Sequence, residues 1–211
     1  MNYQSIPLIG SALLLSTLSA NGQKKNTQPN ILFILCDDMG YGDLSCFGSP
    51  TIKTPNIDRM AIEGQKWSSF YVSASVSSPS RAGLLTGRLG VRTGMYGDQR
   101  RVLFPDSKGG LPSEELTIAE LLKQAGYHTA CIGKWHLGHL PEYMPLRHGF
   151  DYFYGYPYSN DMSPVQNKGA HARNFPPTPL ILDGKEIESE PDQGELTRRY
   201  TEKAVSFIKD H

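Results

Sequence analysis

The chain has 211 residues, 38% of them hydrophobic and 20% charged, and its 21 basic and 21 acidic side chains give a formal net charge of zero. This length supports one domain with its own core, and the hydrophobic content excludes a wholly disordered chain. The balanced charge argues against a nucleic-acid binder or a polybasic membrane-surface protein. Cys36, Cys46 and Cys131 are too few and too scattered for a disulfide framework or a zinc knuckle.

The N-terminus has the pattern of an export signal. An apolar run of roughly 13 residues at positions 6–18 matches a signal-peptide core and is short for a membrane span. Small residues follow at 19–22, and a polar stretch follows them. We therefore predict a signal peptide over residues 1–22, a linker over 23–28, and a periplasmic or secreted protein without stable membrane insertion. A short buried core helix is the alternative interpretation.

The first half of the remaining chain predicts one strand and two helices. The apolar run Ile31–Cys36 is typical of a strand buried on both faces of a parallel sheet. A helix is expected from its N-cap Thr54 to Gly64. The next helix is expected to end at Gly87, with Ser78 as its N-cap and therefore Ser77 just before its first turn.

The second half of the chain also alternates between predicted helices and strands. Thr117 and Glu120 form a capping box for a third helix, whose predicted buried face holds Ile118, Leu121, Leu122 and Ala125. A second buried strand is predicted over 127–132, a hairpin turned at Asp183-Gly184, and an amphipathic helix over 195–210. This alternation predicts an α/β fold. Since two buried strands are few for such a sheet, we expect the N-terminal portion of a longer protein.

Two adjacent carboxylates, Asp37 and Asp38, stand where the first predicted strand ends. Open α/β sheets bind ligands at that edge, and two ionised carboxylates there favour a cation such as Ca²⁺ or Mg²⁺. A pair of solvated loop acids is the alternative interpretation.

Two further segments are candidates for a site. In Ser77–Arg81, the N-terminus of the predicted helix favours an anion. The positive charge of Arg81 interacts unfavourably with the helix dipole there, unless Arg81 faces a bound anion or a metal-bound carboxylate. A surface arginine in a serine-rich loop is the alternative. In Gly133–Gly138, Lys134 and His136 combine a positive charge with a proton-transfer group, although a lone histidine is usually structural. A parallel sheet would bring all these positions to one edge.

These segments resemble the sulfatases of the alkaline phosphatase superfamily, with arylsulfatase A and N-acetylgalactosamine-6-sulfatase as the most similar branch. The sequence SSPSRAGLLTGR at 77–88 resembles the sulfatase signature, and DDMGYGD at 37–43 and GKWHLG at 133–138 resemble the family's other N-terminal motifs. The resemblance covers residues 29–211. It implies a mixed, largely parallel sheet flanked by helices, truncated after the N-terminal part of the catalytic domain.

The resemblance also implies roles for particular residues. Ser77 would be oxidised to Cα-formylglycine, by a radical maturase in this serine-type subgroup, and would join Asp37 and Asp38 on Ca²⁺. Arg81 and Lys134 would stabilise the diol form, and His136 would take a proton from it. Lys134 would also bind the substrate. Ser159 matches a serine close to the sulfate.

The implied activity is hydrolysis of an aryl or carbohydrate sulfate ester. The family completes its calcium site with an Asp-Asn or Asp-His pair further along, which this sequence does not supply before His211. We therefore expect the 211-residue chain alone to be inactive. The alternatives are a phosphodiesterase or phosphonate hydrolase of the same superfamily and a non-catalytic remnant that binds sulfated glycans. Residues 152–190 are expected to shape the pocket, with Tyr152–Tyr154 offering aromatic rings, while His171 and Arg173 are more typical of a solvated loop.

Overall fold

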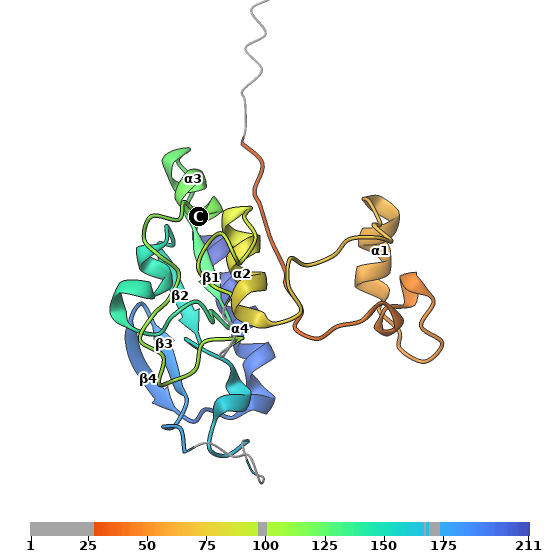
Figure 1. The fold of residues 1–211 in the computed structure, drawn as a ribbon. Coiled ribbons are helices and arrows are strands. Elements are labelled where there is room, and N and C mark those ends of the chain that lie inside the picture. Colours follow the sequence, from red (N-terminus) through yellow and green to blue (C-terminus); the bar gives the residue numbers. More distant parts are fainter. Residues whose placement is uncertain (1–27, 97–100, 167, 169–173) are drawn as a thin grey trace, which may run out of the picture. The chain divides into compact units, whose positions relative to one another are not determined.

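The computed structural model describes residues 28–96, 101–166, 168 and 174–211 (Figure 1). The predicted signal peptide, all but the last residue of the linker, and His171 and Arg173 lie outside the described residues. The chain divides into two compact units, 1–66 and 67–211. No helix among the described residues is long and apolar enough to cross a bilayer.

In unit 1, helix α1 (Pro55–Glu63) starts where the sequence predicts it, after Thr54. Thr54 does not cap the helix backbone directly. Its hydroxyl donates 2.9 Å to Asp58, and the Ser45 hydroxyl donates 2.6 Å to the same carboxylate. The Ser45 hydrogen bond is the main reason that the pKa of Asp58 lies below its ordinary value. This polar cluster ties the first turn of α1 to the short 3-10 turn Ser45–Phe47, which follows another such turn at Tyr41–Asp43.

The predicted buried strand at Ile31–Cys36 does not form. Residues 31–35 lie without regular secondary structure and are 40–68% exposed. An apolar run becomes a buried strand only when neighbouring strands satisfy its backbone and cover its side chains. The described part of unit 1 contains no strand. The prediction is therefore wrong for this segment. An apolar composition indicates only a tendency to form a buried strand, and the strand forms only if another strand pairs with it.

Unit 2 is built on a four-stranded sheet in the order β1-β2-β3-β4 (Figure 1). The strands are β1 (Ala130–Ile132), β2 (Tyr152–Gly155), β3 (Pro179–Leu182) and β4 (Lys185–Ser189). The sheet is mixed, as expected, with β1 parallel to β2 and the other two pairs antiparallel. The expectation that it is largely parallel is wrong for the described residues, because the β3–β4 hairpin adds its strands in the antiparallel sense. The hairpin turns at Asp183 and Gly184, as predicted, and both have the positive φ that a type I′ turn requires.

The α-helices in the described part of unit 2 are α2 (Ser77–Thr86), α3 (Ile118–Gln124) and α4 (Leu196–Asp210). Helix α4 contacts β1 and β2, with Tyr200 edge-on to Tyr154 at 6.0 Å. The capping box at the start of α3 is present as predicted. Its predicted buried face is wrong, because Ala119 is the buried residue and Ile118 and Leu121 are about half exposed.

That difference in α3 has a local cause. A Cβ on Gly149 would overlap the backbone of Ala119 and Glu120, so the helix touches the neighbouring loop backbone at that point. The Thr117 hydroxyl donates 2.8 Å to the His148 carbonyl in the same loop. Close backbone contact at the N-terminus therefore turns the small side chain inward and leaves larger ones in solvent.

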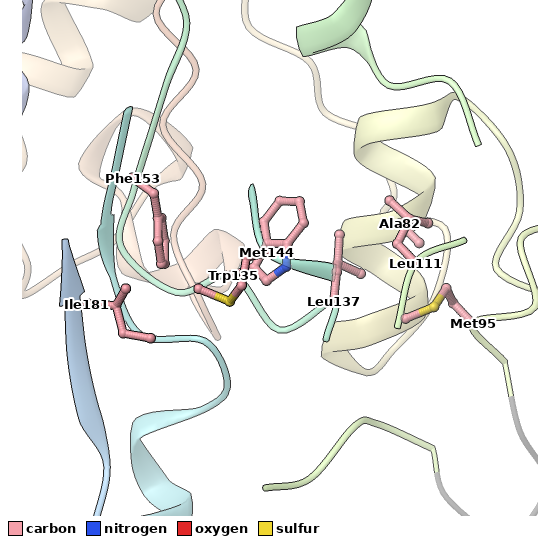
Figure 2. Packing of buried hydrophobic residues seen from close by; sticks show 8 residues of the cluster. All are labelled: Ala82, Met95, Leu111, Trp135, Leu137, Met144, Phe153 and Ile181. Carbon is pink, nitrogen blue, oxygen red and sulfur yellow. The ribbon is translucent and has the colours of Figure 1, made fainter. Parts of the chain in front are cut away.

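The main core surrounds Trp135, whose ring lies among buried side chains from several segments (Figure 2). Its indole N–H donates 2.8 Å to the Tyr143 carbonyl. Phe153 of β2 belongs to the same cluster and Tyr154 to a second one, so both rings are buried. The expectation that these aromatic rings line a ligand pocket is therefore wrong for Phe153 and Tyr154. The members of the main cluster are Ala82, Met95, Leu111, Trp135, Leu137, Met144, Phe153 and Ile181.

Candidate active site

The loop after β1 carries Lys134 and His136, and a continued backbone ladder holds it in place. The amide of Gly133 donates 2.9 Å to the Tyr154 carbonyl, and the amide of Trp135 donates 2.8 Å to the Tyr156 carbonyl. The His136 amide then donates 3.1 Å to the Pro157 carbonyl. The parallel pairing of β1 and β2 thus continues past Ile132 and Gly155, where the two strands end, into the loop.

Gly155 allows the two paired segments to approach each other closely. A Cβ at Gly155 would overlap the carbonyl oxygen of Gly133, so only glycine fits between the two segments. Gly133 itself has a φ of +107°, in the region that favours glycine. The glycine that opens the predicted GKWHLG loop therefore sets the path of Lys134 and His136 over the end of β2.

The N-terminus of α2 meets this loop through Arg81. Ser77 is the first residue of α2, and the helix is preceded by Val76, so Ser78 lies inside the helix rather than capping it. Arg81 Nε donates 2.9 Å to Ser77 Oγ, and Arg81 Nη1 donates 2.6 Å to the Lys134 carbonyl. The structure thus brings three of the predicted site residues together. It also shows why a cation is tolerated near the N-terminus of α2, because two oxygens accept from it.

His136 is buried next to this cluster. Its side chain is 2% exposed, and its Nε2 lies 2.7 Å from the Leu103 carbonyl oxygen. Since a carbonyl only accepts, Nε2 carries the proton of that hydrogen bond. Burial lowers the pKa of His136 to about 4, with smaller contributions from the nearby Lys134 and Arg81 charges, so the ring is neutral at pH 7.

The remaining ring nitrogen of His136 is the chemically interesting one. Nδ1 is buried and has no hydrogen-bond partner among the residues that the structure describes. In a neutral ring with a proton on Nε2, Nδ1 holds a lone pair. The loop that carries Lys134 therefore also carries a buried ring nitrogen with a lone pair that can accept a hydrogen bond.

Ser159 lies two residues beyond Pro157, the last residue of the continued ladder, and is buried. The turn after it is anchored by Glu190, whose carboxylate accepts 2.5 Å hydrogen bonds from Ser163 Oγ and the Thr178 amide. Asn160 Nδ2 also donates 2.7 Å to Gln193 Oε1. Contacts from beyond the hairpin thus hold the segment that carries Ser159.

Asp37 and Asp38 belong to unit 1, whereas the other predicted site residues belong to unit 2. Both aspartates are exposed in a turn, and Asp38 has a φ of +57°. Their oxygens are the donors that Ca²⁺ prefers, but Ca²⁺ takes 6–8 oxygens. Within the described ranges, no group of three or more His, Cys, Asp or Glu residues could hold a metal. These residues by themselves do not fit a complete calcium site.

An open hollow of about 380 Å³ lies between α4 and the start of β2 and contains none of the predicted site residues. Three residues that the sequence did not single out as site residues support the site: Leu103 bonds His136 directly, Ser78 bonds Leu103, and Glu190 bonds the turn after Ser159. Leu103 acts through its backbone, which has no sequence signature. Glu190 is separated by the hairpin from the turn that it anchors, so no local pattern identifies it.

Comparison with known proteins gives the same family over nearly the whole described chain. The sulfatase family model matches residues 29–211. The chain is 43% identical over 214 residues to arylsulfatase G of Rattus norvegicus, covering 90% of this chain and 39% of that protein. It is 52% identical over 175 residues to human arylsulfatase A, covering 77% and 34%. For N-acetylgalactosamine-6-sulfatase of Sus scrofa the identity is 44% over 194 residues, covering 86% and 36%.

The chain thus spans less than half the length of the curated relatives that it matches. A solved structure with a similar fold is Ps i-CgsB in complex with k-i-k-neocarrahexaose. It superposes with a TM-score of 0.67 at 34% identity and covers 82% of this chain and 40% of that one. The motif order, the fold and the sequence relatives agree, and the alkaline-phosphatase-like fold class expected from the sequence is confirmed. This chain belongs to the sulfatase family.

Proposed function

We propose that this chain carries the nucleophile-bearing part of an exported sulfuric ester hydrolase that acts on aryl or carbohydrate sulfates. The observation that carries the proposal is the pair of hydrogen bonds from Arg81 to Ser77 Oγ and to the Lys134 carbonyl. They join a hydroxyl at a helix N-terminus to a guanidinium and to a lysine-bearing loop. Such a set of groups stabilises negative charge on a transferring sulfuryl group.

The proposed nucleophile requires modification of Ser77. Oxidation to Cα-formylglycine by a radical maturase removes two hydrogens, and the aldehyde hydrate supplies both the attacking hydroxyl and the second hydroxyl that releases sulfate. An unmodified serine has only the first. Arg81 and Lys134 offset charge on the sulfuryl oxygens, His136 accepts a proton at Nδ1, and Ser159 contacts the sulfate.

We further propose that Asp37, Asp38 and residue 77 ligate Ca²⁺. Because two aspartates and one side chain fall short of the 6–8 oxygens that Ca²⁺ takes, we expect no calcium-dependent sulfatase activity from the 211-residue chain alone. Such activity in the purified chain would contradict this expectation.

The proposed substrate class is a sulfated polysaccharide. It is supported by the similar structure that holds k-i-k-neocarrahexaose, a carrageenan oligosaccharide. The aromatic rings Phe153 and Tyr154 are buried in the core and are not available to stack on a sugar. Sugar recognition is therefore proposed for the segment around Ser159 and not for β2.

The first experiment is peptide mass analysis of residue 77. The chain is coexpressed with a radical formylglycine maturase, and the tryptic peptide 67–81 is fragmented. Loss of two hydrogens located at Ser77, together with reaction of that peptide with an aldehyde-specific hydrazide, is the expected result. Ser77→Ala abolishes the reaction, whereas Ser69→Ala, on the same peptide, leaves it intact.

An unmodified Ser77 in protein purified with active maturase would count against the proposal. It would favour phosphate-ester or phosphonate hydrolysis, which needs no aldehyde. Binding of a sulfated glycan without hydrolysis, unaffected by Asp37→Ala, would instead indicate a non-catalytic binding remnant.

A further inference from the structure

The backbone of Leu103 is held from both sides by the candidate site. Its amide donates 3.0 Å to Ser78 Oγ, on the residue next to Ser77, and its carbonyl oxygen lies 2.7 Å from His136 Nε2. Ser78 and His136 are 25 and 33 residues away from Leu103 along the chain. One peptide segment therefore links the start of α2 to the histidine ring.

This link is shielded from water. Ser78 is 1% exposed, and the Leu103 side chain packs against the main core cluster. The next residue, Phe104, is held separately, because its amide donates 2.8 Å to Ser107 Oγ and its ring stacks on Phe175 at 5.8 Å. Ser78 Oγ thus accepts from the Leu103 amide, and a second serine, Ser107, accepts from the neighbouring amide.

The link decides which nitrogen of His136 carries the proton. The two ring nitrogens are distinct, and a carbonyl facing Nε2 further stabilises the form with the proton there. The lone pair is then on Nδ1, which is buried and without a partner in the described part of the chain. A displaced Leu103 carbonyl would remove that preference.

We propose that Ser78 is a positioning residue for His136, acting through Leu103: the Ser78 hydroxyl anchors the Leu103 amide, and the Leu103 carbonyl holds His136 with its acceptor lone pair on Nδ1. The functional consequence rests on the proposed role of His136 as proton acceptor. The structural relationship itself does not depend on that role.

The test is nitrogen NMR of the full 211-residue chain with ¹⁵N-labelled histidine, near neutral pH. His136→Gln identifies the signals of this ring by their loss. In the unsubstituted chain we expect the proton on Nε2 and an unprotonated Nδ1. In Ser78→Ala we expect mixed tautomers at His136, whereas Ser78→Thr, which keeps the hydroxyl, should restore the single form.

Amide hydrogen exchange gives a second readout with an internal control. Ser78→Ala should speed exchange of the Leu103 amide roughly tenfold, as expected for one lost hydrogen bond, and leave the Phe104 amide protected. Ser107→Ala is the matched variant: it should release the Phe104 amide and leave both Leu103 and the His136 tautomer unchanged.

Three results would overturn the proposal: a proton on Nδ1 in the unsubstituted chain, an unaltered His136 tautomer in folded Ser78→Ala, or an equal tautomer change in Ser107→Ala. The first result can be read without any variant at position 78. None of them bears on the mass of residue 77, so failure of this proposal and failure of the sulfatase mechanism are distinguishable.

Discussion

Arg81 Nη1 lies 2.6 Å from the carbonyl oxygen of Lys134, a residue 53 positions further along the chain. The same guanidinium donates through Nε to Ser77, one helical turn back. A planar guanidinium can donate in two directions at once, which an ammonium on a single stem does less well. Arg81 therefore joins the two motifs that the sequence presents separately.

We predict that Arg81→Ala lowers the free energy of unfolding of unit 2 by about 1–3 kcal/mol, because two hydrogen bonds to a charged donor are lost. Arg81→Lys should recover only part of it. Urea denaturation followed by Trp fluorescence measures both. Arg92→Ala, an exposed arginine, is the control. Equal stability of Arg81→Lys and the unsubstituted chain would show that one of the two contacts contributes nothing.

In a catalytically competent protein that contains this segment and is matured at residue 77, Arg81→Ala should reduce kcat by roughly a hundredfold or more, as loss of a charge-stabilising donor does. Arg92→Ala should leave kcat unchanged. A reduction confined to KM would mean that Arg81 binds substrate without stabilising the transition state.

Acid should destabilise unit 2 through His136. Burial lowers its pKa from 6.5 to about 4, so the unfolded chain binds a proton in this window and the folded chain does not. Stability therefore falls as the pH drops from about 6.5 to about 4, by about 3 kcal/mol for this residue. Burial also lowers the pKa of His148, whose ring packs against Trp135, and this adds to the loss in the same direction.

The measurement is the urea midpoint at several pH values. His136→Gln should flatten the slope between pH 6.5 and pH 4 while leaving a residual slope from His148. Gln124→Ala, at an exposed and non-titrating position, is the control and should not change the slope. An unaltered slope in His136→Gln would contradict the assignment of a buried neutral imidazole.

Gly155→Ala should disrupt the pairing that positions Lys134 and His136. The added Cβ would overlap the Gly133 carbonyl, so the ladder must separate or the chain must shift, at a cost of about 3 kcal/mol or more. Gly109→Ala is the matched control, since apart from its two chain neighbours no atom of the described residues lies within 4 Å of its Cβ position. Thermal unfolding compares the two. Similar Tm values would show that the close approach is not required.

Glu190 should stabilise the turn after Ser159. Glu190→Ala leaves the buried Ser163 hydroxyl and the Thr178 amide without their carboxylate acceptor, and we expect a loss of about 2–3 kcal/mol. Glu186→Ala, an exposed residue of β4, should change stability by less than about 0.5 kcal/mol. Proteolysis within residues 159–166 in Glu190→Ala, and not in Glu186→Ala, would locate the effect at this turn.

The parts of the fold that short-range chemistry decides were predictable from the sequence. The capping box of Thr117 and Glu120 and the turn at Asp183-Gly184 form as predicted, because each depends on residues within four positions of one another. The spacing of Ser77 and Arg81 likewise places them one helical turn apart, where they bond. The resemblance over 29–211 identified the family for the same reason, since its motifs are local.

Only the tertiary structure decided what depends on distant partners. The apolar run at Ile31–Cys36 predicts a buried strand, yet strand formation needs a neighbour that no local pattern supplies. Strand β2 was not predicted. Its register with β1 depends on Gly155, which lies 22 positions after Gly133. The Leu103 carbonyl that selects the His136 tautomer is identical in kind to every other backbone carbonyl. Sequence thus specified residue types and short-range geometry, whereas burial, pairing and protonation state came from contacts between segments far apart in the chain.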